Sequence, residues 1–318
     1  MEEQLLAFPG QFSWEPKLVG AVSSFKHAVV CGMGGSALQA RLLHAVDPSL
    51  PFTLHQDYGL PYIPDGDKPL IILSSYSGGT EEVLDSAHEA MTRGFPSAVV
   101  ASGGALLDFA RGNNIPHIEL PKENIQPRIA IGYAMLALLR ILGATEQEAK
   151  LRTAGAALQV PEILSEGASL AERLMNRLPI VYGSTANTAI AYFWKIALNE
   201  TAKIPAFTNV VPELCHNELC GYDVVPATES VSKNIDGIFL HDAADHPRNE
   251  KRLTLVEDLM KEKGLGTVRV NLAGADPYEK MLSAVLLGVS VALALAHAYG
   301  VPDAEVPLIE DFKKRMVS

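Results

Sequence analysis

Short apolar runs alternate with amphipathic stretches along the first half of the chain. The runs have the length of buried strands and lie at 27–31, 52–55, 70–74, 97–101 and 115–119. The stretches that separate and follow them predict helices at 35–46, 80–93, 104–112 and 128–143. Strands that alternate with helices indicate a parallel sheet with helices on both faces, so the pattern predicts the α/β class.

The same alternation resumes after a helical linker region at roughly 145–177. The strands predicted there lie at 179–183, 205–210, 236–240 and 266–271, and the helices at 186–203, 249–263 and 277–299. The stretch "VVCGMGGSALQA" (29–40) also aligns with "IVYGSTANTAIA" (180–191), each a strand, a small-residue turn and a helix start. We therefore predict two doubly wound domains, at 1–150 and 151–318.

Length and charge agree with this division and narrow the choice of ligand. A chain of 318 residues exceeds the usual size of one domain. A net charge of −11 argues against nucleic acid and anionic membranes, which favour a basic face. An anionic substrate must therefore be held by local donors.

One segment, "MLSAVLLGVSVALALAHAYG" (281–300), approaches the length of a membrane span. Its small residues suit close packing, and we expect a buried helix. The N-terminus lacks the basic and apolar regions of a signal peptide. The three cysteines, Cys31, Cys215 and Cys220, make no disulfide framework, which indicates a reducing cytoplasm.

The stretch "LIILSSYSGGTEEVL" (70–84) places small and hydroxylated residues between a predicted strand and a predicted helix. We call residues 75–80 the serine loop. Its Ser75, Ser77 and Thr80, together with unpaired amides at the helix N-terminus, would surround a phosphate. The alternative is a plain turn in which Thr80 only caps the helix.

A second loop, "GMGGS" at 32–36, follows the first strand; we call it the glycine loop. Residues 32–37 match the dinucleotide-binding pattern G-x-G-x-x-A, with Asp57 as a distant acidic partner. A dinucleotide site therefore stays open as an alternative. Loops that follow adjacent strands of a doubly wound sheet meet at one edge. Gly34, Gly35 and Ser36 are therefore better placed as a second wall of the phosphate site.

Six stretches in order resemble the bifunctional phosphoglucose/phosphomannose isomerases of the sugar isomerase (SIS) family. They are "GMGGSA" (32–37), "SYSGGTEE" (75–82), "PRIAIGYA" (127–134), "WKIALNETAKIPAF" (194–207), "PELCHNELCGYD" (212–223) and "IEDFKKRM" (309–316). The resemblance covers almost the whole chain. It implies an SIS fold in each half, a homodimer with shared active sites, and isomerisation of hexose 6-phosphates without metal or cofactor.

Carried over by position, the resemblance assigns two sets of residues. Phosphate would be held by Ser75, Ser77 and Thr80, with Gly34, Gly35 and Ser36 nearby. The chemistry would fall to Arg128, Glu200, His216 and Lys313.

The reaction itself requires a base, a cation for the enediolate and a proton shuttle. Glu200 ends an otherwise apolar helix face, which suits a base; the alternative is a surface carboxylate paired with Lys203 or Lys195. Arg128 precedes an apolar helix, where its guanidinium would stabilise an enediolate; the alternative is a surface arginine.

His216 lies in a polar turn and suits a proton shuttle. The alternatives are a packed, hydrogen-bonded histidine and a zinc site with Cys215 and Cys220, although adjacent ligands rarely face one metal. The assignment of Lys313 depends on the resemblance alone. A shift of the alignment by one residue would assign Lys314 instead.

Two departures from the family pattern bear on specificity. Gly79 replaces the usual Asn of the serine loop, which keeps the backbone amide. Val306 replaces a Thr linked to the mannose epimer, so a hydroxyl is lost at similar volume. Two other functions stay open: a non-catalytic sugar-phosphate sensor, and an isomerase of another phosphosugar.

Overall fold

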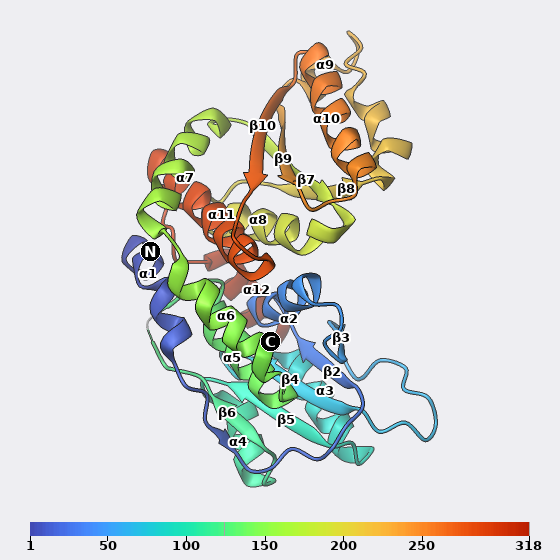
Figure 1. Ribbon diagram of the computed structural model, residues 1–318, viewed down its shortest axis with the longest axis vertical. Helices are drawn as coiled ribbons and strands as arrows, with labels where there is room; N and C mark the ends of the chain where they lie inside the picture. The colour runs from blue at the N-terminus through green and yellow to red at the C-terminus, as the bar shows by residue number, and fades with distance from the viewer. Residues whose placement is uncertain (124, 318) are drawn as a thin grey trace. The chain divides into compact units, whose positions relative to one another are not determined.

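The structure, a computed structural model, describes residues 1–123 and 125–317 and separates into two compact units (Figure 1). We call Ala7–Leu158 the N-terminal unit. The C-terminal unit consists of Met1–Leu6 and the residues from Gln159 onward. The division therefore falls after Leu158 rather than at 150, and the start of the chain belongs with the second half.

The N-terminal unit contains a sheet of strands in the order β1-β6-β5-β4-β2-β3. These are β1 (Leu18–Val19), β6 (His117–Glu119), β5 (Ser97–Ala101), β4 (Leu70–Ser75), β2 (Ala28–Gly32) and β3 (Phe52–His55). All neighbours are parallel except β1, which pairs antiparallel with β6. The helices are η1 (Phe8–Ser13), α2 (Gly35–Val46), α3 (Glu81–Thr92), α4 (Gly104–Gly112), α5 (Ile131–Leu142) and α6 (Thr145–Ala157).

The burial of the central strands explains why the sequence shows them as continuous apolar runs. Every residue of β2 and of β4 is buried, as expected for central parallel strands covered on both faces. The chain leaves β2 for β3 on one side and returns to β4 on the other. The register pairs Gly32 with Ser74, so the glycine loop and the serine loop begin side by side at this switch point.

The C-terminal unit contains a parallel sheet in the order β10-β9-β7-β8. Its strands are β7 (Leu178–Ser184), β8 (Phe207–Val211), β9 (Ile235–Asp242) and β10 (Gly266–Leu272). Its helices are α1 (Glu2–Leu6), α7 (Val160–Leu174), η2 (Thr185–Asn187), α8 (Thr188–Glu200), η3 (Glu213–His216), η4 (Glu218–Tyr222), α9 (Glu229–Ser232), α10 (Pro247–Glu262), α11 (Pro277–Tyr299) and α12 (Pro307–Val317). From β7 the chain again runs to β8 on one side and β9 on the other, which repeats the plan of β2, β3 and β4.

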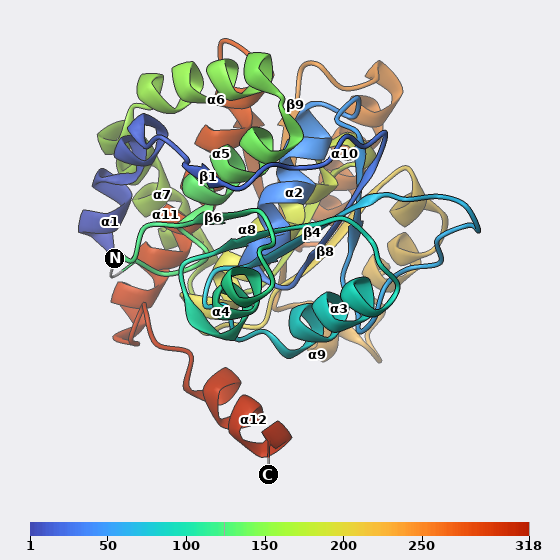
Figure 2. The ribbon, with the colours of Figure 1, turned by 90° about the horizontal axis from the view of Figure 1, so that it is seen from below.

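Two C-terminal helices differ sharply in burial. The long helix α11 is apolar enough to span a membrane, but 78% of its most apolar window is buried inside the structure, as predicted for a core helix. In α12, by contrast, residues 307–316 are all exposed. Figure 2 shows this helix at the end of a segment that leads away from α11. The doubly wound α/β architecture predicted from the sequence is confirmed in both halves.

Candidate active site

Hydroxyl and amide groups bind one another within the serine loop. Ser75, the last residue of β4, is 1% exposed, and its Oγ lies 2.8 Å from Thr80 Oγ1. The N–H of Gly78 donates to the same Ser75 oxygen over 3.1 Å, and the N–H of Gly79 donates to Ser77 Oγ over 3.3 Å. These polar groups gather at the N-terminus of α3, where the helix dipole favours an anion.

Thr80 occupies the N-cap position of α3, yet its side chain makes no capping hydrogen bond. Its hydroxyl pairs with Ser75 instead. The interpretation of Thr80 as only a helix cap is therefore wrong, and the hydroxyl belongs to the polar cluster of the serine loop.

Hydrogen bonds also join the serine loop to the glycine loop. The N–H of Tyr76 donates to Ser36 Oγ over 2.9 Å. Behind it, the buried Gln39 donates from Nε2 to Ser74 Oγ over 3.0 Å and to the main-chain oxygen of Ser36. The two loops are therefore one structural unit, as their adjacent strands predicted.

One position of the serine loop, residue 78, requires glycine because the backbone of the β5–α4 turn lies against it. Gly78 has φ +69°, and a Cβ there would lie 1.8 Å from the carbonyl oxygen of Gly103. A side chain at this position would displace the β5–α4 turn. Gly78 thus fixes the curvature that brings Ser75 and Thr80 together.

The segment that carries Arg128 lies close to the glycine loop. A Cβ on Gly35 would lie 3.3 Å from the carbonyl carbon and oxygen of Pro127, so the segment that carries Arg128 packs on the glycine loop. Arg128 is 3% exposed, and its Nη1 donates to Gln126 Oε1 over 3.3 Å. The surface-arginine interpretation is therefore wrong, because the guanidinium is a buried cation in the same unit as the serine loop.

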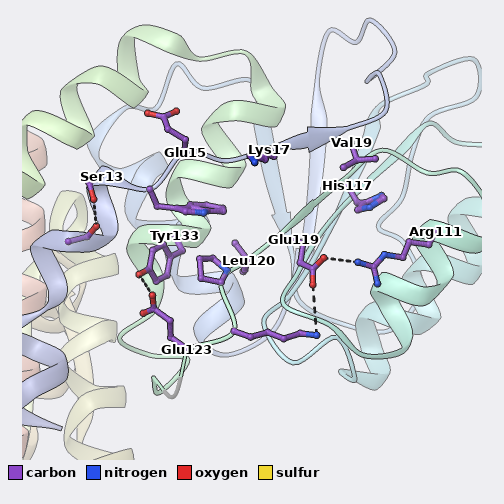
Figure 3. Close-up of a pocket in the computed structure, with 14 residues that line it drawn as sticks. Ser13, Glu15, Lys17, Val19, Arg111, His117, Glu119, Leu120, Glu123 and Tyr133 are labelled. Carbon is purple, nitrogen blue, oxygen red and sulfur yellow. Dashed lines mark hydrogen bonds and ion pairs between the residues drawn. The ribbon is translucent and has the colours of Figure 1, made fainter.

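The N-terminal unit also has a hollow of about 1110 Å³, which Figure 3 shows. Trp14 and Tyr133 meet edge to face in its lining, with ring centroids 5.5 Å apart. The Tyr133 hydroxyl donates to Glu123 over 2.9 Å, and Arg111 pairs with Glu119 over 2.6 Å. No residue of the serine or glycine loop lines this hollow. The serine loop nevertheless adjoins it, because the Tyr76 hydroxyl donates to the carbonyl oxygen of the lining residue Pro121 over 3.2 Å.

Glu200 ends α8 in the C-terminal unit and is half-buried. The helix end is held by Lys203, whose Nζ donates to the main-chain oxygens of Glu200 and Glu305. Lys195, the other lysine considered as a partner, lies with its ammonium 5.7 Å from the ring centroid of Tyr192. Lys203 thus ties the end of α8 to the segment that leads into α12.

His216 is the last residue of η3 and is exposed. The interpretation as a packed histidine is therefore wrong. Cys215 is half-buried and Cys220 is exposed. Over residues 1–123 and 125–317, no three His, Cys, Asp or Glu side chains are grouped so that they could hold a metal ion.

Lys313 lies on the exposed helix α12 and pairs with Glu310 over 3.0 Å. Lys314 is also exposed. Both lysines are thus exposed on the same helix, and the resemblance alone favours Lys313.

The edge of the second sheet that corresponds to the two loops is acidic. Asn187 Nδ2 donates to Asp242 Oδ2 over 3.1 Å and to Asp245 Oδ2 over 3.2 Å. Ser184 Oγ donates to Asp245 over 2.7 Å, and Lys280 Nζ donates to Asp242 over 2.6 Å. Burial raises the pKa of Asp245, and the Asp242 charge adds to the effect. A phosphate would meet carboxylates at this edge.

The predicted site residues therefore belong to two sets. The N-terminal unit holds the serine loop, the glycine loop and Arg128, which the structure brings together. The C-terminal unit holds Glu200, His216 and Lys313, on α8, η3 and α12 respectively.

Comparison with known proteins decides the family. A bifunctional phosphoglucose/phosphomannose isomerase of Caldicellulosiruptor bescii is 35% identical over 309 residues, which cover 91% of this chain and 88% of that relative. The chain belongs to the bifunctional phosphoglucose/phosphomannose isomerases. A second isomerase of this name, from Thermoplasma acidophilum, is 30% identical over 92% of the chain and 90% of the relative.

A family model agrees with this membership, and a solved structure shows the same fold. Residues 164–316 match the model of the bacterial phospho-glucose isomerase C-terminal SIS domain. A hypothetical protein of Thermus thermophilus has the same fold, with a TM-score of 0.72 at 16% identity, over 100% of this chain and 87% of that one.

Proposed function

We propose that this chain is an aldose–ketose isomerase that interconverts fructose 6-phosphate with glucose 6-phosphate and mannose 6-phosphate. Its relatives carry the phosphoglucose and phosphomannose activities in their names. The observation that carries the proposal is the joined serine and glycine loops at the N-terminus of α3. Hydroxyl groups, backbone amides and a helix dipole at one point are suited to a phosphate dianion.

The substrate phosphate binds to Ser75, Ser77 and Thr80, with the glycine-loop amides as the second wall. Gly79 presents its amide without a side chain, so the loss of the family's Asn at this position leaves room for the phosphate oxygens. The acidic edge of the second sheet repels phosphate. We therefore place one phosphate site on each chain, in the N-terminal unit.

Proton transfer between C1 and C2 is assigned to Glu200. Its carboxylate removes the proton from C2 of the aldose or C1 of the ketose and returns it to the neighbouring carbon. Both transfers pass through a cis-enediolate whose oxygens carry negative charge. The permanently charged, buried Arg128 stabilises that charge, and Lys313 adds a second cation.

The cyclic sugar must open before C1 and C2 become acidic. A histidine can pass a proton to the ring oxygen near neutral pH, and His216 is assigned this step. The mechanism uses no metal and no cofactor.

We further propose that the enzyme acts in the cytoplasm as a homodimer with shared sites. His216 of the partner subunit would act together with Glu200 of the first chain. The exposure of His216 supports this arrangement, because an exposed ring is available to a second chain. The chain's acidity and its buried α11 agree with a protein that binds neither nucleic acid nor membrane.

The mannose reaction depends on space beside α12. Val306 precedes this helix, and its carbonyl accepts from the N–H of Ile309 over 3.0 Å. Because Val has no hydroxyl at the place of the usual Thr, we expect mannose 6-phosphate to form more slowly than glucose 6-phosphate.

Isomerisation in D₂O tests the reaction type. An enediolate route with a single exchanging base incorporates solvent deuterium at C2 of glucose 6-phosphate, which proton NMR detects. Isomerisation with no deuterium at C2 over many turnovers would instead indicate direct hydride transfer and remove Glu200 from the proposed role.

A further inference from the structure

The carboxylate of Glu218, two residues after His216, attaches the helical turn η4 to the second sheet. The Tyr182 hydroxyl donates to Glu218 Oε1 over 2.5 Å, and the Tyr222 hydroxyl donates to the same oxygen over 2.7 Å. The other oxygen, Oε2, accepts from Asn209 Nδ2. Glu218 thus links η4 to β7 through Tyr182 and to β8 through Asn209.

The two tyrosines are well suited to hold this carboxylate. Tyr182 is fully buried and Tyr222 is 6% exposed, and both lie in the core beside Phe239. Burial raises the pKa of each tyrosine far above neutrality, with the Glu218 carboxylate adding to the effect. Both hydroxyls therefore stay protonated. They also lie within hydrogen-bond distance of each other, so Tyr182, Tyr222 and Glu218 form one hydrogen-bonded cluster.

His216 lies between two fixed points. Two residues before it, Leu214 is fully buried in the same core as Tyr182. Two residues after it, Glu218 makes its three side-chain bonds. The intervening turn is further fixed by Asn217, whose Nδ2 donates to Glu213 Oε1 over 2.9 Å. The backbone of the turn is therefore anchored while the His216 ring is exposed.

We propose that Glu218 is a positioning residue that holds His216 where it meets the sugar ring. This inference rests on the ring-opening role proposed for His216. Glu218 acts through the backbone of the turn: its carboxylate is enclosed by the hydroxyls of Tyr182 and Tyr222 and the amide of Asn209, and it does not serve as a second base. Displacement of a catalytic group by about 1 Å costs up to 10²-fold in rate, which sets the scale of the effect.

The test compares three conservative variants of the full chain. Glu218→Gln keeps the size but replaces one acceptor oxygen by a donor that opposes Tyr182 and Tyr222 or Asn209. Tyr222→Phe removes the hydroxyl that contacts both Glu218 and Tyr182 and keeps the packing of the ring. Tyr299→Phe is the matched control, because the Tyr299 hydroxyl accepts from the N–H of Asn176 at a place remote in sequence from the turn.

We expect kcat to fall roughly tenfold or more in Glu218→Gln and severalfold in Tyr222→Phe, with KM for fructose 6-phosphate within about twofold of the parent. Tyr299→Phe should lower the urea midpoint without lowering kcat. In a His216→Ala background, Glu218→Gln should lower the residual kcat by less than about twofold, because its effect passes through His216.

The outcomes separate this inference from the proposed function. If His216→Ala keeps the parent rate, the ring-opening assignment is wrong whatever Glu218 does. If His216→Ala is inactive while folded Glu218→Gln and Tyr222→Phe keep parental kcat, only the positioning role is overturned. Should Glu218→Gln fail to fold, the kcat of Tyr222→Phe decides.

Discussion

The hydroxyl of Ser36 accepts a hydrogen bond from the main-chain N–H of Tyr76 over 2.9 Å. Forty positions of sequence separate the two residues, yet the pairing of β2 with β4 makes them neighbours. This bond joins the glycine loop to the serine loop. The proposed phosphate site therefore has two walls whose positions are fixed by the sheet.

Replacement of Ser75, Ser77 and Thr80 together by Ala should raise KM for fructose 6-phosphate much more than it lowers kcat. The phosphate is distant from the reacting carbons and supplies mainly uniform binding. Each hydrogen bond to a charged group contributes about 1.5–3 kcal/mol, so an increase in KM of at least tenfold is expected. Steady-state kinetics measures it, with inorganic phosphate as a competitive inhibitor of the parent.

Thr92→Ala is the matched control for the triple variant. Thr92 lies at the other end of α3, where its hydroxyl donates to the carbonyl of His88 over 2.8 Å. Its removal should leave KM unchanged. An unchanged KM in the triple variant would mean that the serine loop serves only the local fold.

Glu200→Gln should keep sugar-phosphate affinity and lower kcat by roughly 10² to 10⁴, the contribution of a positioned general base. The exposed Glu166 of α7 provides the control, since Glu166→Gln removes a carboxylate from the same unit without touching α8. Glu200 is not the base if its Gln variant retains more than about a tenth of the parental kcat.

The sequence predicted the sheets well because central parallel strands are buried on both faces. β2 and β4 read as continuous apolar runs for this reason, and the small residues after them marked the loops. The start of the chain could not be placed in this way. The two-residue strand β1 is defined only by its pairing with β6, about a hundred residues away.

The candidate site shows the same limit. Ser75, Thr80 and Ser36 were predictable because each follows a recognisable strand or begins a helix. The sequence did not predict that the Thr80 hydroxyl bonds Ser75 and not the helix backbone, because the same residues allow either hydrogen bond. Glu218 was missed because its partners Tyr182 and Tyr222 reach it only after β7 and η4 have packed.

Subunit exchange tests the shared site. Glu200→Gln and His216→Ala, each inactive alone, should regain activity when mixed, because one site of every mixed dimer carries both defects and the other carries neither. Random exchange of equal amounts makes half of the dimers mixed, so about a quarter of the parental activity should return.

A mixture of Glu200→Gln with Glu200→Ala controls for exchange itself, because no intact site can form. If mixed dimers of the first pair are shown to form by mass and remain inactive, each site belongs to a single chain.

The stability of the N-terminal unit should depend on Glu148 at acidic pH. Glu148 is 6% exposed, and hydrogen bonds from Arg140 over 2.7 Å and Arg152 over 2.7 Å lower its pKa from the ordinary 4.5. A carboxyl with a lowered folded pKa stabilises the fold above its unfolded pKa and loses that contribution as pH falls. The free energy of unfolding should therefore fall below about pH 4.5.

Urea unfolding of the parent and Glu148→Gln between about pH 3 and 7 measures this contribution. The parent should be the more stable protein at pH 7, and the difference should shrink as the carboxyl becomes protonated. A difference that does not change with pH would mean that Glu148 contributes packing and not charge.

The proposed reaction itself is tested most directly by product analysis. The chelator-treated protein is incubated with fructose 6-phosphate, and glucose 6-phosphate and mannose 6-phosphate are resolved and quantified over time. We expect both products to appear without added metal, glucose 6-phosphate first, and Glu200→Gln at equal concentration to form neither at a comparable rate. Fructose 6-phosphate that remains unchanged with the folded parent, or turnover that begins only when a metal ion is added, would contradict it.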